Sequence, residues 1–195
     1  GIITELGEWA LAEAARQIVA WRQQGIGVPR MAVNLSPRQF HATDLANRLE
    51  RILTAAGVEN EWIELEITES AAMAHPEGAV EVLQRLRERG IQIAMDDFGT
   101  GHSSLAMLRT LPLNVLKLDR SFVQHLPEPE TDAAVAGAVV TLARRLGLSV
   151  VAEGVETEAQ QHFLAGIGCD LLQGYLFSRP LPAAEFEAWL SKRYG

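Results

Sequence analysis

Six short apolar segments of this 195-residue chain each end in polar or charged side chains. In chain order these side chains are Asn34, Glu66, Asp96 with Asp97, Lys117 with Asp119, Glu153 and Gln173. Carboxylate and amide oxygens, with no His or Cys among them, suit Mg²⁺ or Mn²⁺ rather than structural zinc. The adjacent Asp96 and Asp97 could bind a pair of cations about 3.5–4 Å apart, as in phosphodiester hydrolysis. A lysine among them could orient a water molecule or neutralise charge on a phosphoryl oxygen.

These side chains can act together only if the elements that carry them bring the six ends to one place. Apolar segments alternate along the chain with helical segments, which is typical of parallel βαβ units. The expected strands are 30–36, 62–70, 91–97, 113–119, 148–154 and 169–175. The expected helices are 1–24, 44–56, 77–89, 105–108, 132–146, 158–165 and 183–194. The apolar stripe of the first helix is predicted to include Leu6, Trp9, Ala10, Ile18 and Trp21.

Two architectures fit this alternation: an open doubly wound sheet and a (β/α)8 barrel. The segment "NLSPRQF" after the first expected strand lacks the glycines of a nucleotide-binding loop, which disfavours the open sheet. In a barrel the carboxyl ends of all strands converge on one face, where active sites are built. We therefore expect residues 1–195 to form a single α/β domain with a TIM-barrel-like fold. It is expected to be incomplete at its N-terminus, with about six of the eight strands present.

Composition and charge narrow the function classes. The net charge of −8 gives no general attraction to nucleic acid or anionic lipid, so a phosphate-bearing substrate needs bound cations to reverse the local sign. No apolar run approaches the roughly 18 residues of a membrane span, and the N-terminus lacks the features of a signal peptide. The single Cys169 suits a reducing compartment and is expected to be a small buried residue. These observations predict a cytoplasmic domain.

Each candidate residue also has an ordinary structural explanation. Asn34 could cap a turn, Asp97 could form an Asx turn, and Glu153 could be a loop acid. Lys117 and Asp119 could form a surface ion pair. On six successive strand ends of one barrel, however, all of these explanations must hold at once. The combined pattern therefore favours a functional site. The arginines Arg22 and Arg30 are expected to lie on solvated helix faces.

The chain resembles the EAL domain, the cyclic-di-GMP phosphodiesterase family. The resemblance is carried by "NLSPRQF", "ELEITES", "DDFGTGHSSL", "LKLDRSFV", "VVAEGVET" and "QGYLFSRPLP", which follow the order of the family and cover essentially the whole chain. It implies hydrolysis of cyclic-di-GMP to linear pGpG in bacterial signalling, with two Mg²⁺ or Mn²⁺ ions as cofactors.

The resemblance also implies roles for individual residues. Asn34, Glu66, Asp96 and Asp97 would be metal ligands. Lys117 and Glu153 would be catalytic, and Gln173 and Asp119 would contact the substrate. Glu69 would hold the loop that follows Asp97, and Glu156 would support the site from behind its ligands. That loop would also mediate a homodimer, and a longer parent protein could carry sensory or GGDEF domains.

The sequence departs from the family pattern in two places. The Glu-Ala-Leu motif that gives the family its name is absent, because the matching region begins after it. His102 stands where the family usually has an aromatic residue such as Tyr, and we expect this change to tune the loop. Three hypotheses remain: an active phosphodiesterase, an inactive EAL module that binds cyclic-di-GMP or a partner protein, and an unrelated barrel hydrolase or lyase that uses one divalent metal.

Overall fold

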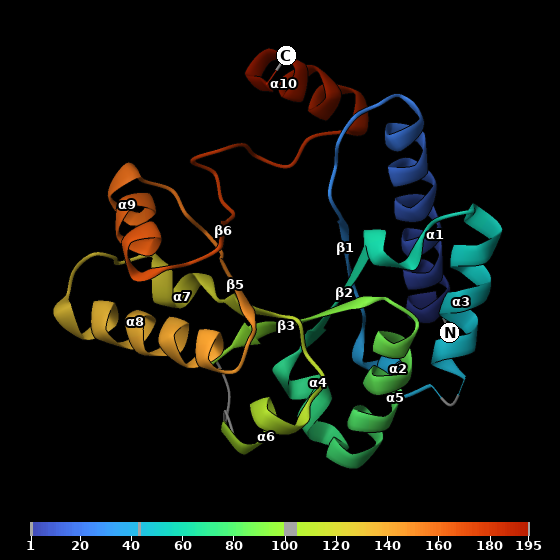
Figure 1. The fold of residues 1–195 in the computed structure, drawn as a ribbon, viewed down its shortest axis with the longest axis horizontal. Helices are drawn as coiled ribbons and strands as arrows, with labels where there is room; N and C mark the ends of the chain where they lie inside the picture. The colour runs from blue at the N-terminus through green and yellow to red at the C-terminus, as the bar shows by residue number, and fades with distance from the viewer. Residues whose placement is uncertain (1, 43, 100–104, 195) are drawn as a thin grey trace.

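The computed structural model describes residues 2–42, 44–99 and 105–194 (Figure 1). Within these residues the strands form one parallel sheet in the order of the sequence. The strands are β1 (Met31–Asn34), β2 (Ile63–Thr68), β3 (Gln92–Phe98), β4 (Val115–Leu118), β5 (Ser149–Ala152) and β6 (Leu171–Leu172). The sheet curls into a half-barrel, with β1 and β6 as its edges. The α/β, TIM-barrel-like prediction is confirmed, and each of the six expected strands is present.

Helices supply the crossovers that parallel strands require. They are α1 (Ile2–Gln23), α2 (Pro37–Phe40), α3 (Leu45–Ala56), the 3-10 helix η1 (Asn60–Trp62), α4 (Glu69–Ala74), α5 (Pro76–Glu88), α6 (Leu105–Thr110), α7 (Arg120–Val123), α8 (Glu130–Arg145), α9 (Glu158–Ile167) and α10 (Ala183–Tyr194). The short helices α2, α4 and α7 were not predicted. Each follows a strand closely and begins at a side chain that accepts a backbone N–H, namely Ser36, Thr68 or Asp119.

The two faces of the sheet differ in composition. On β2, Ile63, Leu65 and Ile67 are buried in the main hydrophobic core, whereas the alternate residues Glu64 and Glu66 belong to the opposite, inner face. Strand geometry sends successive side chains to opposite faces, so this alternation is the expected one. Figure 1 shows the helices around the outside of the curled strands, from α1 and α3 on the right, through α4, α5 and α6 below, to α8 and α9 on the left. The outer face therefore forms the core with the helices and leaves the inner face available for a site.

The packed stripe of α1 differs from the predicted one. Leu6 and Trp9 are 53% and 59% exposed, so the prediction that they face the core was wrong. The buried positions are instead Leu11, Ala15, Ile18 and Trp21. This stripe continues toward the N-terminus at Gly7, which lies against the side chain of Gln39 on α2. α1 packs against α3, β1 and α2, and Leu6 and Trp9 lie off the sides that make these contacts.

The last helix, α10, packs against the first helix, α1. The Trp21 indole of α1 donates a 2.7 Å hydrogen bond to Glu187 of α10, and its ring lies 5.0 Å from that of Phe186. Figure 1 accordingly shows α10 near the C-terminal end of α1. Among the described residues, no helix is both long and apolar enough to cross a membrane.

Candidate active site

Strand register places the predicted strand-end residues on the inner face of the sheet. Residues two apart on a strand share a face, and residues paired across parallel strands do so as well. The pairs that carry this face across the sheet are Asn34 with Glu66, Glu66 with Ala94, Ala94 with Val115, Lys117 with Val151, and Val151 with Leu171. Counting two residues onward from Ala94, Val151 and Leu171 reaches Asp96, Glu153 and Gln173. The sequence-predicted residues therefore converge on one end of the inner face.

Asp97 departs from this alternation. The β3–β4 register shifts between Met95 and Phe98, so that the strand carries an extra residue at this point. The backbone of Asp97 has φ 55°, a left-handed conformation that is uncommon outside glycine, and its N–H is hydrogen-bonded to Oδ1 of Asp96 at 3.0 Å. Strained conformations of this kind concentrate at functional sites. In a regular strand Asp96 and Asp97 would point to opposite faces, and the bulge interrupts that alternation at Asp97.

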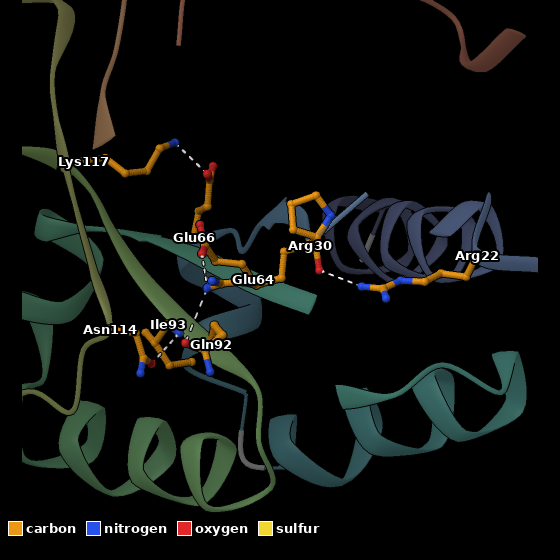
Figure 2. Close-up of polar contacts among 9 residues, drawn as sticks. Arg22, Arg30, Glu64, Glu66, Gln92, Ile93, Asn114 and Lys117 are labelled. Atoms are coloured by element: carbon orange, nitrogen blue, oxygen red, sulfur yellow. Dashed lines mark hydrogen bonds and ion pairs between the residues drawn. The ribbon is translucent and has the colours of Figure 1, made fainter. Parts of the chain in front are cut away.

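Lys117 lies at the centre of the converging acids. Its Nζ atom is 2.7 Å from Oε1 of Glu66, 2.6 Å from Oε1 of Glu153 and 3.3 Å from Oδ1 of Asp96. Only 5% of the Lys117 side chain is exposed. Figure 2 shows the lysine extending from β4 toward the Glu66 carboxylate on β2. We call Lys117, Glu66, Asp96 and Glu153 the carboxylate cluster.

The carboxylate cluster holds more negative than positive charge. Burial raises the pKa of Glu66 and of Glu153 above the ordinary glutamate value, and their hydrogen bonds to Lys117 only partly oppose this effect. Burial alone would lower the pKa of Lys117, but its hydrogen bonds to Glu153 and Glu66 raise it. Burial together with the neighbouring Asp96 also raises the pKa of Asp97. One ammonium group cannot neutralise this many carboxylates, so the site favours additional positive charge.

The donor chemistry of the cluster fits hard divalent cations. Its carboxylates and the nearby Asn34 amide supply oxygen donors of the type that bind Mg²⁺ or Mn²⁺. In the described part of the chain, no three His, Cys, Asp or Glu side chains are already arranged around a common metal position. In the cluster itself, Lys117 lies between the carboxylates. Glu66 and Asp96 have the chemistry to hold a cation, with Asp97 and Asn34 beside them.

Glu69 holds the beginning of the loop after β3. Its buried carboxylate accepts the backbone N–H of Gly99 at 3.2 Å. Gly99 has φ +91°, and a Cβ atom there would lie 2.7 Å from the Phe122 ring, so both the conformation and the space require glycine. The predicted support of this loop by Glu69 thus has a direct contact. The rest of the loop, with His102 and the predicted dimer contact, lies outside the described residues.

Asp119 and Glu156 lie beyond the ends of β4 and β5. The Asp119 side chain accepts the backbone N–H of Ser121 at 3.0 Å and begins α7. Burial would raise the pKa of Asp119, but the hydrogen bonds from Ser121 lower it overall. Glu156 forms a 2.8 Å ion pair with Arg120. Asp119 therefore caps the N-terminus of α7, a structural role that is separate from its predicted contact with the substrate.

The two edge strands carry exposed candidates. Asn34 ends β1 and Gln173 follows β6, and both side chains are exposed. The backbone of Gln173 is fixed, since its N–H is bonded to the carbonyl of Ala152 and its carbonyl accepts the N–H of Val155. These contacts place Gln173, and the β1–β2 register places Asn34, at the rim of the inner face. Among the hydrogen bonds of the described residues, neither side chain contacts the carboxylate cluster.

A hollow of about 690 Å³ runs along the inner face from the carboxylate cluster to the opposite end of the strands. At that opposite end Arg30 donates to Glu64 at 3.1 Å and to Gln92 at 3.4 Å (Figure 2). Burial raises the pKa of Glu64, although the charge of Arg30 opposes it. Arg30 was predicted to be merely solvated, and Glu64 was not predicted at all. The signal available in the sequence was the spacing of Glu64, two residues before Glu66 and hence on the same face.

Comparison with protein families gives a match over most of the chain. Residues 1–180 match the family described as "EAL domain". The chain is 45% identical over 188 residues to the bifunctional diguanylate cyclase/cyclic di-GMP phosphodiesterase MucR of Pseudomonas aeruginosa, covering 96% of the chain and 27% of that protein. It is 44% identical over 190 residues to the cyclic di-GMP phosphodiesterase NbdA of the same organism, covering 97% and 24%. The chain thus spans about a quarter of the length of these relatives.

Solved structures have the same fold. A cyclic-di-GMP complex of the MucR phosphodiesterase matches with TM-score 0.91 and 45% identity, covering 95% of this chain and 75% of that one. The EAL domain of DcpA from Mycobacterium smegmatis matches with TM-score 0.93 and 38% identity, covering 98% and 86%. BlrP1 from Klebsiella pneumoniae, in a complex with manganese and cyclic-di-GMP, matches with TM-score 0.81 and 33% identity, covering 91% and 45%. The half-barrel with its carboxylate cluster belongs to the EAL domain family.

Proposed function

We propose that this protein is a metal-dependent phosphodiesterase that hydrolyses cyclic-di-GMP to linear pGpG. The observation that carries the proposal is the carboxylate cluster, in which three acids share a single buried lysine at the carboxyl end of a parallel sheet. An excess of buried negative charge has no structural use unless cations join it. The named activities of MucR and NbdA and the cyclic-di-GMP bound to MucR support this substrate.

Two Mg²⁺ or Mn²⁺ ions are the proposed cofactors. The residues proposed to hold them are Asn34, Glu66, Asp96 and Asp97. When bound, such ions lower the pKa of a bound water and stabilise charge on a phosphoryl group. The manganese complex of BlrP1 supports the choice of metal.

The other residues of the site are proposed to orient water and substrate. Lys117 is proposed to offer a positive charge to a developing phosphoryl oxyanion. Glu153 is the most exposed acid of the carboxylate cluster, at 20% against 8% for Glu66 and 13% for Asp96. Water therefore reaches Glu153 most readily, which suits it to accept a proton from the attacking water. Gln173 and Asp119 are proposed to contact the substrate from the rim.

The assembly and setting of the protein form part of the same proposal. The loop after Asp97, anchored at Gly99 by Glu69, is proposed to join two copies of the protein in a cytoplasmic homodimer. The relatives that extend well beyond the matched region support additional sensory or GGDEF domains in a longer protein. Light scattering during size-exclusion chromatography, with and without cyclic-di-GMP and Mn²⁺, measures the oligomeric state. A single protomer under every condition contradicts the dimer.

The test of function is a turnover assay on protein first stripped of metal with EDTA. After addition of Mn²⁺, chromatography should show cyclic-di-GMP disappearing and one linear dinucleotide appearing, and EDTA should stop the reaction. Binding of cyclic-di-GMP without turnover would instead establish an inactive receptor module. If cyclic-di-GMP is neither bound nor hydrolysed, the proposed substrate is refuted. A Glu64→Gln variant is the matched control, because it changes an acid on the same strand and face outside the carboxylate cluster.

A further inference from the structure

Every charged contact of Lys117 in the described part of the chain is with an acid of the carboxylate cluster. An ammonium group has three N–H donors, and Nζ of Lys117 has three carboxylate oxygens at 2.6, 2.7 and 3.3 Å. The side chain is 5% exposed, so bulk water has little access to it. The lysine is the cation around which the three acids are gathered in this structure.

Two of these partners, Glu66 and Asp96, are also residues proposed to hold divalent metal. An ordinary Mg²⁺–oxygen distance is about 2.0–2.1 Å. A metal at that distance from Oε1 of Glu66 and Oδ1 of Asp96 would compete for the same oxygens with an ammonium that is 2.7 and 3.3 Å away, and the two cations would repel each other. The third partner, Glu153, is not among the proposed ligands and lies nearest to Nζ.

We infer that Lys117 is an internal counter-ion that holds the carboxylate cluster together without metal and is displaced from Glu66 and Asp96 when metal binds. This inference rests on the metal site of the proposed function and adds a coupling to it. After displacement Lys117 remains hydrogen-bonded to Glu153, so metal binding moves the ammonium toward the residue proposed to accept the proton from water. The lysine thus stabilises the empty site and opposes the metal until it is displaced.

The composition of the chain permits a direct observation of this movement. The only lysines in the sequence are Lys117 and Lys192, and Lys192 is exposed on α10. Protein labelled with ¹³C-lysine should therefore give two Cε signals in an NMR spectrum. The Lys192→Met variant assigns them by removing one. Addition of Mg²⁺, which is diamagnetic, should shift the Cε signal of Lys117 and leave that of Lys192 in place.

A second measurement follows metal affinity. A nearby charge changes the proton affinity of a carboxylate by about 10-fold to 1000-fold, and a divalent ion carries twice the charge of a proton. Lys117→Met should therefore bind Mn²⁺ at least about 10-fold more tightly than the wild type when free Mn²⁺ is measured by EPR. Lys192→Met is the matched control and should bind Mn²⁺ as the wild type does.

Each outcome separates this inference from the function on which it rests. If Mg²⁺ binds and cyclic-di-GMP is hydrolysed while the Lys117 signal stays in place, the inference fails and the function stands. Equal or weaker Mn²⁺ binding by folded Lys117→Met also overturns the inference. If the wild type binds no metal, both the metal site and the inference fail. Should Lys117→Met not fold, the labelled wild type decides alone.

Discussion

The two ends of the inner hollow place similar residues in different electrostatic settings. Glu64 and Glu66 lie two residues apart on β2, both on the inner face and both with a pKa raised by burial. Glu64 meets Arg30, whose side chain is 40% exposed, and the two charges balance. Glu66 meets Lys117, which is 5% exposed and shared with Asp96 and Glu153. An imbalance of buried charge, rather than a buried acid alone, therefore distinguishes the site.

The first prediction compares the two glutamates through activity. Glu66→Gln should lower the kcat for cyclic-di-GMP by more than about 100-fold. Substitution of a residue that only hydrogen-bonds to a metal ligand already lowers metal affinity or activity by about 10–100-fold, and Glu66 is proposed to be a ligand itself. Glu64→Gln should leave kcat within about threefold of the wild type, since Glu64 pairs with Arg30 and only interactions that strengthen in the transition state change kcat. Initial rates at saturating Mn²⁺ give both values. Equal losses would remove the distinction between the two ends.

The second prediction compares the two cations through stability. In EDTA, Lys117→Met should lower the free energy of unfolding by about 3–5 kcal/mol, because it leaves three acids without their buried partner. Arg30→Met should lower it by no more than about 1 kcal/mol, since its ion pair with Glu64 is partly exposed. Urea denaturation followed by circular dichroism measures both. A larger loss for Arg30→Met would show that the Arg30–Glu64 pair stabilises the fold more than the contacts of Lys117 do, contrary to this account.

The third prediction extends the comparison to the loop next to the carboxylate cluster. Glu69→Gln should lower kcat about 10–100-fold while changing the substrate KM little, because the glutamine holds the Gly99 N–H less strongly than the carboxylate does. Ser70→Ala is the neighbouring control, since Ser70 is exposed. A normal kcat for Glu69→Gln would limit the role of this hydrogen bond to folding.

The smallest predicted effect separates capping from substrate binding at Asp119. Asp119→Ala should lower the free energy of unfolding by about 1 kcal/mol through loss of the Ser121 contact, and Asp119→Asn should restore most of it. Because the folded-state pKa of Asp119 is lowered, its contribution is present above the unfolded pKa near 4 and is lost as the pH falls below that value. Urea titrations at pH 3 and pH 6 test this. A kcat loss in both variants, with normal stability, would favour substrate contact instead.

Much of the fold could be predicted from the sequence because its signals are local. Apolar runs alternate with helical periodicity, and the long helices α3, α5 and α8 begin and end within about two residues of the predicted positions. The strand ends were equally visible, since each apolar run stops at a polar residue. The short helices α2, α4 and α7 were missed because a single capped turn has no periodicity to detect.

The remaining features depend on contacts between distant parts of the chain. The sequence indicated a lysine among acids, but the sharing of Lys117 by three carboxylates depends on the relative positions of β2, β3, β4 and β5. The bulge at Asp97 depends on the β3–β4 register. The pairing of Arg30 with Glu64 spans two strands, and the exposure of Trp9 depends on how α1 packs against α3, β1 and α2. No local pattern encodes these relations.

The most direct measurement is an Mn²⁺ titration of wild type, Glu66→Gln and Glu64→Gln followed by EPR. Both acids lie on one strand and one face, so the pair isolates the effect of charge imbalance. We predict that the wild type and Glu64→Gln bind Mn²⁺ with similar affinity and that Glu66→Gln binds at least about 10-fold more weakly. Wild-type affinity in Glu66→Gln, or an equal loss in Glu64→Gln, would contradict the assignment of the carboxylate cluster as the metal site.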